Sequence, residues 1–248
     1  MTPARRIDAA ITADCASMQP SRRVLIALIA GALLGAPAAV RADTPAAEPT
    51  EDPAPFAQSR AAVRYWPVAT RNAEWRTVSM RRDDGGFDGR ELRRFNAPRP
   101  AARADNPTRR HVGVDLFANA GDDVIAVEDG VIIAFYPFLR ARTGEMSYAL
   151  LVAHNGYVAN YGEVRGASLS ALGLSIGDNV RAGQRIGAVS DTRQLHFETY
   201  LPGATHSQSW RHGAPRPSHV LNPTHLLLDL AQNGRRLGPG DSVIAATH

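Results

Sequence analysis

The segment YALLVAHNGYVANY, residues 148–161, places an Asn155-Gly156 pair between two runs whose composition is typical of β-strands. Asn-Gly favours the tight turn whose twist suits a two-stranded antiparallel hairpin. Two further runs of this type lie upstream, at residues 124–127 and 131–135, and the turn-forming residues 128–130 separate them. This spacing predicts a fold built from short antiparallel strands.

Helices play little part in the predicted fold. No segment before residue 222 shows a convincing helical period over ten residues, whereas residues 224–230 predict one or two helical turns. The stretch Gly121–Ala126 resembles Gly177–Ala182, since each has a Gly-Asp turn before a strand and a second glycine after it. This similarity indicates a duplicated β unit. The alternative is chance similarity between two turn-strand units.

Two histidine motifs carry the chemistry. In the first, His111-Val-Gly-Val-Asp115, residues four apart on a strand point to the same face, and Gly113 leaves room between them. The second motif, around His196, alternates in the same manner. Its apolar residues face one way, and its polar residues face the other, namely Gln194, His196 and Glu198. Two imidazoles and one carboxylate form a ligand set for zinc with an open fourth position.

Composition restricts the possible partners and chemistry. The chain has 28 basic residues, all of them arginine, against 24 acidic ones, which gives a formal charge of +4. The arginines are scattered without interleaved aromatic residues, so we expect no nucleic-acid partner; an acidic polymer such as cell wall fits such a surface better. The single cysteine is Cys15, so a cysteine-based zinc site or nucleophile elsewhere is excluded.

The N-terminal region predicts export. Two arginines lead into an apolar run at residues 24–40, which is too short and too rich in Ala, Gly and Pro for a stable membrane span. We therefore predict a signal peptide at residues 1–42, cleaved after Ala42, and a periplasmic or extracellular protein. A Sec signal is favoured over a twin-arginine signal. Beyond it we predict a disordered linker (43–60), an N-terminal extension of the domain (61–110), the domain itself (111–230) and a flexible tail (231–248).

The two motifs, with the segments between them, resemble peptidase family M23, the LytM and lysostaphin type. The first motif matches the family's His-x-Gly-x-Asp, and Gln194 to Glu198 matches its His-x-His-Phe-Glu apart from the first residue. The resemblance covers roughly residues 110–230. It implies an all-β fold, an antiparallel β-sheet sandwich of the LytM or duplicated-hybrid type with a long N-terminal extension. It also implies Zn²⁺ as cofactor, held by His111, Asp115 and His196.

Two departures mark a divergent member of that family. Glu163 stands where the family has a catalytic histidine in Tyr-x-His, and Gln194 stands where it has the first histidine of the last motif. Gln194 can hydrogen-bond but cannot accept a proton, whereas a carboxylate beside zinc can act as a general base. We therefore expect Glu163 to serve as the base and Gln194 to serve as a hydrogen-bonding orienter, since an amide can bond a water or a carbonyl.

The resemblance implies a secreted zinc endopeptidase that cuts peptide crosslinks in peptidoglycan. The alternative is a catalytically impaired relative that binds cell wall or a wall-associated protein partner as a scaffold or regulator. A lipoyl or biotinyl carrier, which residues 176–187 also resemble, is excluded because the chain has no lysine.

Two further residues have competing interpretations. Trp210, in a loop rich in Pro, Gly and Ser, is predicted as a substrate contact, with packing over the sheet edge as the alternative. His154, next to the hairpin turn, fits a turn-capping role better than a metal ligand.

Overall fold

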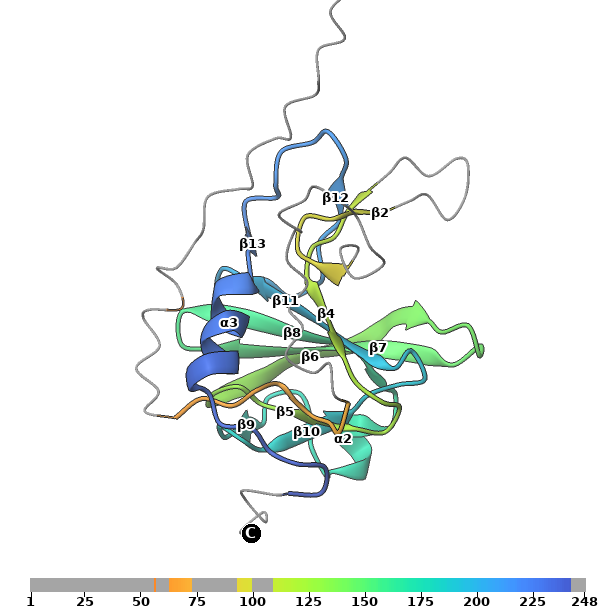
Figure 1. The fold of residues 1–248 in the computed structure, drawn as a ribbon, viewed down its shortest axis with the longest axis vertical. Helices are drawn as coiled ribbons and strands as arrows, with labels where there is room; N and C mark the ends of the chain where they lie inside the picture. Colours follow the sequence, from red (N-terminus) through yellow and green to blue (C-terminus); the bar gives the residue numbers. More distant parts are fainter. Residues whose placement is uncertain (1–55, 57–62, 73–92, 100–108, 242–248) are drawn as a thin grey trace, which may run out of the picture. The chain divides into compact units, whose positions relative to one another are not determined.

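The structure is a computed structural model that describes residue 56 and residues 63–72, 93–99 and 109–241 (Figure 1). These residues belong to one compact unit, Ala47–His248. The predicted signal peptide lies outside the described residues. So does the predicted linker, apart from Phe56, whose buried ring packs edge-on against Tyr157 at 5.2 Å between ring centroids.

One large sheet organises the domain. Its strand order is β13-β11-β8-β7-β6-β9, with β4 paired to β11, and all of these pairs are antiparallel. The predicted all-β, antiparallel fold is therefore confirmed. The strands are β4 (Val114–Phe117), β6 (Gly130–Arg140), β7 (Met146–His154), β8 (Tyr157–Arg165), β9 (Asn179–Val180), β11 (Gln194–Tyr200) and β13 (Val220–Leu221).

The central hairpin forms where the sequence predicts it. Strands β7 and β8 pair with His154 opposite Tyr157, so that Asn155 and Gly156 make a two-residue connection. Gly156 has a φ of 91°, in the left-handed region that glycine adopts without a Cβ penalty. The turn residues thus set the register of the two strands.

Two small sheets flank the large one. The first has the order β1-β5-β10, with β1 (Val68–Ala69), β5 (Asp123–Ile125) and β10 (Arg185–Ala188). The second has the order β12-β3-β2, with β12 (Trp210–Arg211), β3 (Arg109–Arg110) and β2 (Pro98–Arg99). It joins two strands from before the first histidine motif to a strand from the late loop, close to the end of β4 where that motif lies (Figure 1).

The two similar Gly-Asp segments, residues 121–126 and 177–182, form the same turn. The Asp122 carboxylate accepts a hydrogen bond from the backbone N–H of Asn119, and Asp178 does the same with Ser175. The two turns nevertheless feed different sheets, because β5 pairs with β1 and β10 whereas β9 pairs with β6. The similarity therefore holds for the turn and the start of the strand.

Two short helices complete the described residues. The predicted C-terminal helix is present as α3 (Thr224–Asn233), and three of its leucines are buried in the main hydrophobic core. Full burial of each leucine stabilises the fold by about 1.5–3 kcal/mol. The one-turn helix α2 (Ser168–Ala171) was not predicted, since four residues are too short to show a helical period. Within the described part of the chain, no helix is long and apolar enough to span a membrane.

The chain beyond α3 runs beside the start of the domain. Arg235 exchanges backbone hydrogen bonds with Arg64 and Trp66, and Tyr65 and Arg235 form an isolated parallel bridge. Arg64 also forms an ion pair with Asp229 on α3. The predicted flexible tail thus includes Arg235, which makes specific backbone contacts. It also includes Leu237, which packs on a small apolar cluster.

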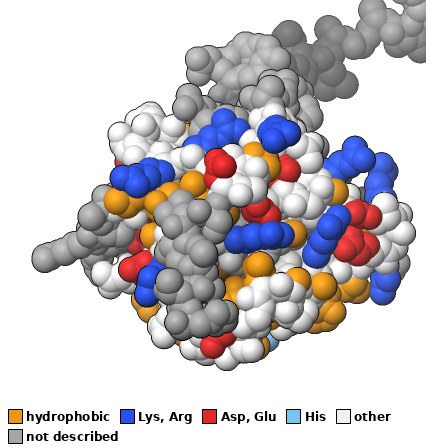
Figure 2. All heavy atoms as spheres, turned by 90° about the horizontal axis from the view of Figure 1, so that it is seen from below, with side chains coloured by type: hydrophobic (Ala, Val, Ile, Leu, Met, Phe, Trp, Pro, Cys, Tyr) orange, Lys and Arg blue, Asp and Glu red, His pale blue; other side chains and the backbone are white. Residues whose placement is uncertain are grey.

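Charges of both signs appear on the face that Figure 2 shows, where arginine side chains lie among acidic ones and apolar patches. Among the described residues, Arg185 forms an ion pair with Asp123 at 2.7 Å, and Arg165 with Asp191 at 3.7 Å. Interspersed charges of this kind do not form a single basic stripe on that face.

Candidate metal centre

Three ligand-type atoms converge at the junction of β4 and β11. Nε2 of His111 lies 3.1 Å from Oδ1 of Asp115 and 3.1 Å from Nδ1 of His196. Nδ1 of His196 lies 2.7 Å from the same Asp115 oxygen. All three residues are buried. The structure therefore brings together the three residues that the sequence proposes as metal ligands.

Strand register explains most of this convergence. In the β4–β11 pair, Asp115 lies directly opposite His196, so the two side chains project from the same face of the sheet. The expectation that His111 lies on the same strand is wrong, because β4 begins at Val114. His111 instead follows β3, and its side chain reaches the cluster from the short connection between the two strands.

Gly113 makes the close approach of that connection possible. A Cβ atom at this position would lie 2.5 Å from the carbonyl oxygen of Phe197 and 2.8 Å from Cγ of Glu198. Any larger residue would push the connection away from β11. Glycine is thus needed between the two ligands, although the space it leaves is taken by β11 rather than by the metal site.

Hydrogen bonds fix which nitrogen of each histidine faces the cluster. Nδ1 of His111 lies 2.8 Å from the carbonyl oxygen of Arg94, which can only accept, so this nitrogen carries the proton. Nε2 of His196 lies 2.7 Å from Oε1 of Glu198 and donates to it. The lone pair of the other nitrogen of each ring is thereby directed at the cluster, as in the carboxylate–histidine pairs of metal sites.

Glu198 is itself held by three donors. Its carboxylate accepts hydrogen bonds from Nδ2 of Asn160 at 2.5 Å, the hydroxyl of Tyr200 at 2.7 Å and the hydroxyl of Ser207 at 2.9 Å. Burial opposes its charge, but the His196 ring and these donors keep the pKa of Glu198 below its usual value. The carboxylate that orients His196 is therefore ionised and fixed.

Electrostatics prepare the cluster for a cation. Burial lowers the pKa of His111, which favours the neutral ring that a metal needs. Burial opposes the charge of Asp115, but His111 and His196 hold the pKa of its carboxyl well below the usual range. Burial also opposes the charge of His196, but Glu198 and Asp115 raise its pKa to about 10. A metal ion therefore displaces a proton that the two carboxylates otherwise retain.

The geometry fits zinc. A tetrahedral ion with ligands at about 2.0–2.1 Å separates neighbouring ligand atoms by about 3.3 Å. The two separations of 3.1 Å need to open by about 0.2 Å, and the separation of 2.7 Å needs to open by about 0.6 Å. Two neutral imidazole nitrogens and one carboxylate also form a ligand set that favours zinc over harder cations. Three protein ligands leave the fourth position for water or substrate.

Three side chains linked by hydrogen bonds, those of Arg93, Gln194 and Glu163, lie beside the cluster. Nη1 of Arg93 donates to Oε1 of Gln194 at 2.8 Å, and Nε2 of Gln194 donates to Oε1 of Glu163 at 3.0 Å. The guanidinium also lies over the ring of Phe117, 4.4 Å from its centroid. Because Arg93 fixes the oxygen end of the amide, the nitrogen end of Gln194 must face Glu163. Glu163 and Gln194, the two departures from the resembled motifs, are thus in direct contact.

Glu163 is buried in an unusual conformation. Its φ of 66° is in the left-handed region, which costs a residue other than glycine of order 1–3 kcal/mol. Its Oε2 atom is buried without a hydrogen-bond partner among the described residues. Burial, reinforced by the charge of Asp115, raises the pKa of Glu163 above its ordinary value. A buried carboxylate with a raised pKa, and with one oxygen that has no hydrogen-bond partner among the described residues, is suited to accept a proton.

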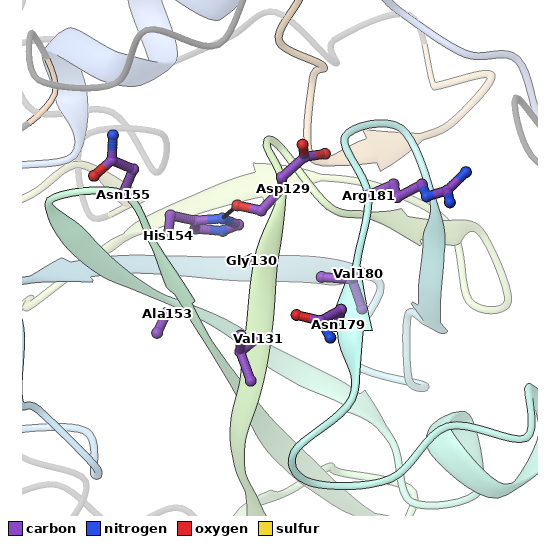
Figure 3. A pocket seen from close by; sticks show the side chains of 9 residues that line it. All are labelled: Asp129, Gly130, Val131, Ala153, His154, Asn155, Asn179, Val180 and Arg181. Carbon is purple, nitrogen blue, oxygen red and sulfur yellow. Dashed lines mark hydrogen bonds between the residues drawn. The ribbon is translucent and has the colours of Figure 1, made fainter.

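His154 belongs to a different place. Its Nδ1 donates to the carbonyl oxygen of Asp129 at 3.0 Å, and its Nε2 accepts from the hydroxyl of Tyr161 at 3.1 Å. Figure 3 shows the ring beside a pocket of about 370 Å³, which is lined by neither His111 nor His196. Burial lowers the pKa of His154 to about 4. The ring is therefore neutral and internally bonded, in agreement with the structural role expected for it.

Trp210, which is predicted as a substrate contact, packs inside the domain. The indole is buried, its N–H donates to the carbonyl oxygen of Ala214 at 3.0 Å, and its ring packs on Phe95 at 5.7 Å. Its apolar surface and its donor are thus already used inside the domain. The alternative interpretation, packing at the edge of a sheet, describes what the structure shows.

Sequence reasoning missed the residues that surround the ligands. Arg99 donates to Oδ2 of Asp115 at 2.5 Å, and Asn160 and Tyr200 hold Glu198. Tyr200 was detectable, because it continues the polar alternation of β11 two residues after Glu198. Arg99 lies in a segment without periodicity, and no local pattern distinguishes it from the other arginines.

The fold and the site define a class: an antiparallel β domain whose two histidines and one aspartate form a cluster suited to a metal ion. Within that class, residues 109–208 match the family model of peptidase family M23. The matched range includes His111, Asp115, Glu163, Gln194 and His196. The match over these residues confirms the resemblance inferred from the two motifs.

Solved structures of several peptidases are similar to the chain. Csd3 of Helicobacter pylori shares 21% identity over 68% of this chain and 40% of its own length, with a TM-score of 0.34. The catalytic domain of lysostaphin from Staphylococcus simulans shares 22% identity over 54% and 88%, with a TM-score of 0.34. A zinc-containing peptidase from Vibrio cholerae shares 26% identity over 44% and 37%, with a TM-score of 0.31. No curated protein matches the sequence.

Proposed function

We propose that the protein is a zinc endopeptidase that hydrolyses peptide crosslinks of peptidoglycan. The observation that carries this proposal is the convergence of Nε2 of His111, Oδ1 of Asp115 and Nδ1 of His196, whose separations fit three corners of a zinc tetrahedron. The M23 match over residues 109–208 supports the reaction class, because members of that family are zinc-dependent peptidases.

The three cluster residues would hold the ion. When bound, zinc lowers the pKa of a water molecule and polarises the scissile carbonyl group. His111 and His196 contribute neutral nitrogens, while Asp115 contributes the negative charge that a dication needs. Arg94 and Glu198 keep the two rings in the required tautomers, so little reorganisation is needed before binding.

We assign Glu163 as the general base, the residue that accepts a proton from the attacking water. Its raised pKa and the unpartnered Oε2 atom support this role. As the amide bond breaks, the same carboxyl group can give the proton to the nitrogen of the leaving amine. Gln194, which donates to the other carboxylate oxygen, positions Glu163 and leaves Oε2 available.

Hydrolysis of purified peptidoglycan tests the assignment. With zinc supplied, the wild-type protein should release free amino groups, and Glu163→Gln should reduce that rate by about 10²–10⁴-fold, the usual contribution of a general base. Glu145→Gln is a matched control, because Glu145 lies at the β6–β7 turn and accepts a hydrogen bond from Asp191 outside the cluster. Equal zinc content in all three proteins keeps metal loading out of the comparison.

The alternative function is a catalytically impaired protein that binds cell wall or a wall-associated partner. The observation that favours it is the replacement of both family histidines, with the Gln194 amide already bonded on both ends. Lack of hydrolysis by a zinc-loaded wild-type protein, across several crosslink types, would refute the peptidase proposal. Sedimentation of the protein with intact peptidoglycan would then support the binding function.

Export is part of the proposal and is supported by the sequence of residues 22–42. Expression in a bacterial host should give a mature protein that begins at Asp43 in the fraction outside the cytoplasm. N-terminal sequencing measures this directly, and an unprocessed chain in the cytoplasm would refute it.

A further inference from the structure

A short stretch before the matched M23 range packs against the metal cluster. Residues 93–99, called here the arginine segment, pair with the first ligand through the backbone. The N–H of Asn96 donates to the carbonyl oxygen of His111 at 2.8 Å, and the N–H of His111 donates to that of Ala97 at 2.9 Å. Phe95 is buried and packs on Trp210. The segment is thus part of the folded domain at this site.

Two functional groups of the segment contact metal ligands directly. The carbonyl oxygen of Arg94 accepts from Nδ1 of His111 at 2.8 Å. Nη2 of Arg99 donates to Oδ2 of Asp115 at 2.5 Å, and this is the oxygen that does not face the two histidines. One residue fixes a tautomer, and the other fixes the rotation of a carboxylate. Outer partners of this kind tune metal affinity in other sites.

A third contact reaches the residues assigned to proton transfer. Arg93 donates to Gln194, which in turn donates to Glu163. Thus the two arginines and one backbone carbonyl of a seven-residue segment hold two proposed ligands and the proposed base. Each of these contacts therefore depends on a group that lies outside β4 and β11, the strands of the histidine motifs.

We propose that the arginine segment is a positioning element of the metal site, and that Arg99 sets the metal affinity through Asp115. This inference rests on the proposed zinc site and is independent of whether the protein hydrolyses peptidoglycan. It assigns to residues outside the 109–208 range a role in the centre that this range contains.

Two opposing effects decide the sign of the Arg99 contribution. A guanidinium repels a dication, but the Arg99 side chain is 26% exposed, so water weakens that repulsion. The Asp115 side chain is only 2% exposed, and loss of Arg99 would leave its Oδ2 atom buried without this donor. Without that donor the carboxylate can turn its other oxygen away from the two histidines, so zinc binding must restore the orientation, and this cost exceeds the weakened repulsion. Removal of Arg99 should therefore weaken zinc binding rather than strengthen it.

Competition with a chromophoric chelator measures this effect on the full chain. Arg99→Leu should bind zinc about 10–100-fold more weakly than the wild type, the usual effect of removing an outer partner. Arg99→Lys keeps a charged donor and should recover part of the loss. Arg109→Leu is the matched control, because Arg109 is the exposed cross-strand neighbour of Arg99 and should change the affinity by less than about twofold.

Hydrogen exchange provides a second readout that a purely structural role would not change. Because coupling between two binding events is reciprocal, zinc should slow exchange of the Asn96 and His111 amides in the wild type. It should slow them less in Arg99→Leu. Circular dichroism of each variant separates loss of folding from loss of affinity.

The outcomes separate this inference from the proposed function. Zinc binding by Arg99→Leu that equals or exceeds wild-type affinity overturns the positioning role. A wild-type protein that binds zinc but cleaves no crosslink refutes the peptidase proposal and leaves the positioning role intact. A wild-type protein that binds no zinc refutes both.

Discussion

Two buried histidines in neighbouring parts of one sheet have opposite electrostatic character. His196 on β11 lies between the carboxylates of Asp115 and Glu198, which raise its pKa to about 10 against the effect of burial. His154 on β7 lies between a carbonyl oxygen and a tyrosine hydroxyl, and burial lowers its pKa to about 4.

The difference lies in the partners rather than in burial. Neutral partners satisfy both nitrogens of His154 and leave no charge for a cation to meet. At His196, one carboxylate orients the ring while the other contacts the second nitrogen, so that a metal ion that displaces the ring proton meets both a lone pair and negative charge. Carboxylate contacts at both nitrogens thus distinguish His196 from His154.

The largest expected difference between the two histidines concerns metal binding. His196→Ala should lose stoichiometric zinc and reduce hydrolysis to background, because a third of the proposed ligand set is gone. His154→Ala should keep its zinc, although it should be less stable. Metal analysis of protein purified without chelator measures both, and retention of zinc by His196→Ala would refute the ligand assignment.

Acid stability should reveal His154 instead. Its folded pKa of about 4 lies below the ordinary value of 6.5, so the unfolded chain binds the extra proton first. Stability from this group is therefore complete above pH 6.5 and falls as the pH drops toward 4, by up to about 3 kcal/mol.

His154→Gln cannot titrate in this range and should lose less stability between those two pH values. Urea unfolding of wild type and variant at pH 7 and pH 4.5, in the same buffer with chelator, gives the comparison. An identical loss in both proteins would contradict a buried, neutral His154.

The orienting carboxylate should matter less than the ligand itself. Glu198→Gln keeps the shape of the side chain but weakens its hold on His196, so zinc affinity should fall about 10–100-fold. Tyr161→Phe removes the corresponding partner of His154 and should leave zinc affinity unchanged, while it costs about 1–3 kcal/mol of stability. Chelator competition and thermal unfolding distinguish the two effects, and equal zinc affinity in Glu198→Gln and wild type would count against the orienting role.

The smallest expected effect concerns the strained backbone beside the cluster. Glu163→Gly and Glu163→Ala both remove the carboxylate, and both should abolish hydrolysis. Only glycine adopts the φ of 66° without strain, so Glu163→Gly should be more stable by about 1 kcal/mol. Denaturant unfolding of the two variants measures the difference, and greater stability of the alanine variant would show that the backbone relaxes at this position.

Local chemistry made much of the fold predictable. The Asn155-Gly156 turn, the Gly-Asp turns and the leucines of α3 act through neighbours in sequence, so the hairpin, strand starts and C-terminal helix could be read directly. The one-turn helix α2 could not be read, since its few residues depend on their surroundings. Assembly of β2, β3 and β12 into one sheet joins distant segments and has no local pattern.

The features of the candidate site also divide into those that the sequence predicts and those that the tertiary structure decides. The sequence by itself singled out His111, Asp115 and His196 as candidate ligands, through their residue types and their match to the two motifs of the resembled family. It also showed Gln194 and Glu163 at positions where the resembled motifs have histidines. The burial of Trp210, the tautomers of the two ligands and the left-handed backbone at Glu163 were decided by tertiary structure.

The arginine segment is the clearest case of the second kind. Arg93 and Arg99 are two of many arginines in the sequence, and their importance depends on which acceptor each guanidinium meets. Strand alternation is a local property and fixes which way His196 and Asp115 point. Which donor a buried carboxylate or amide receives from a distant segment is set by packing of the whole domain, and so only the tertiary structure identifies it.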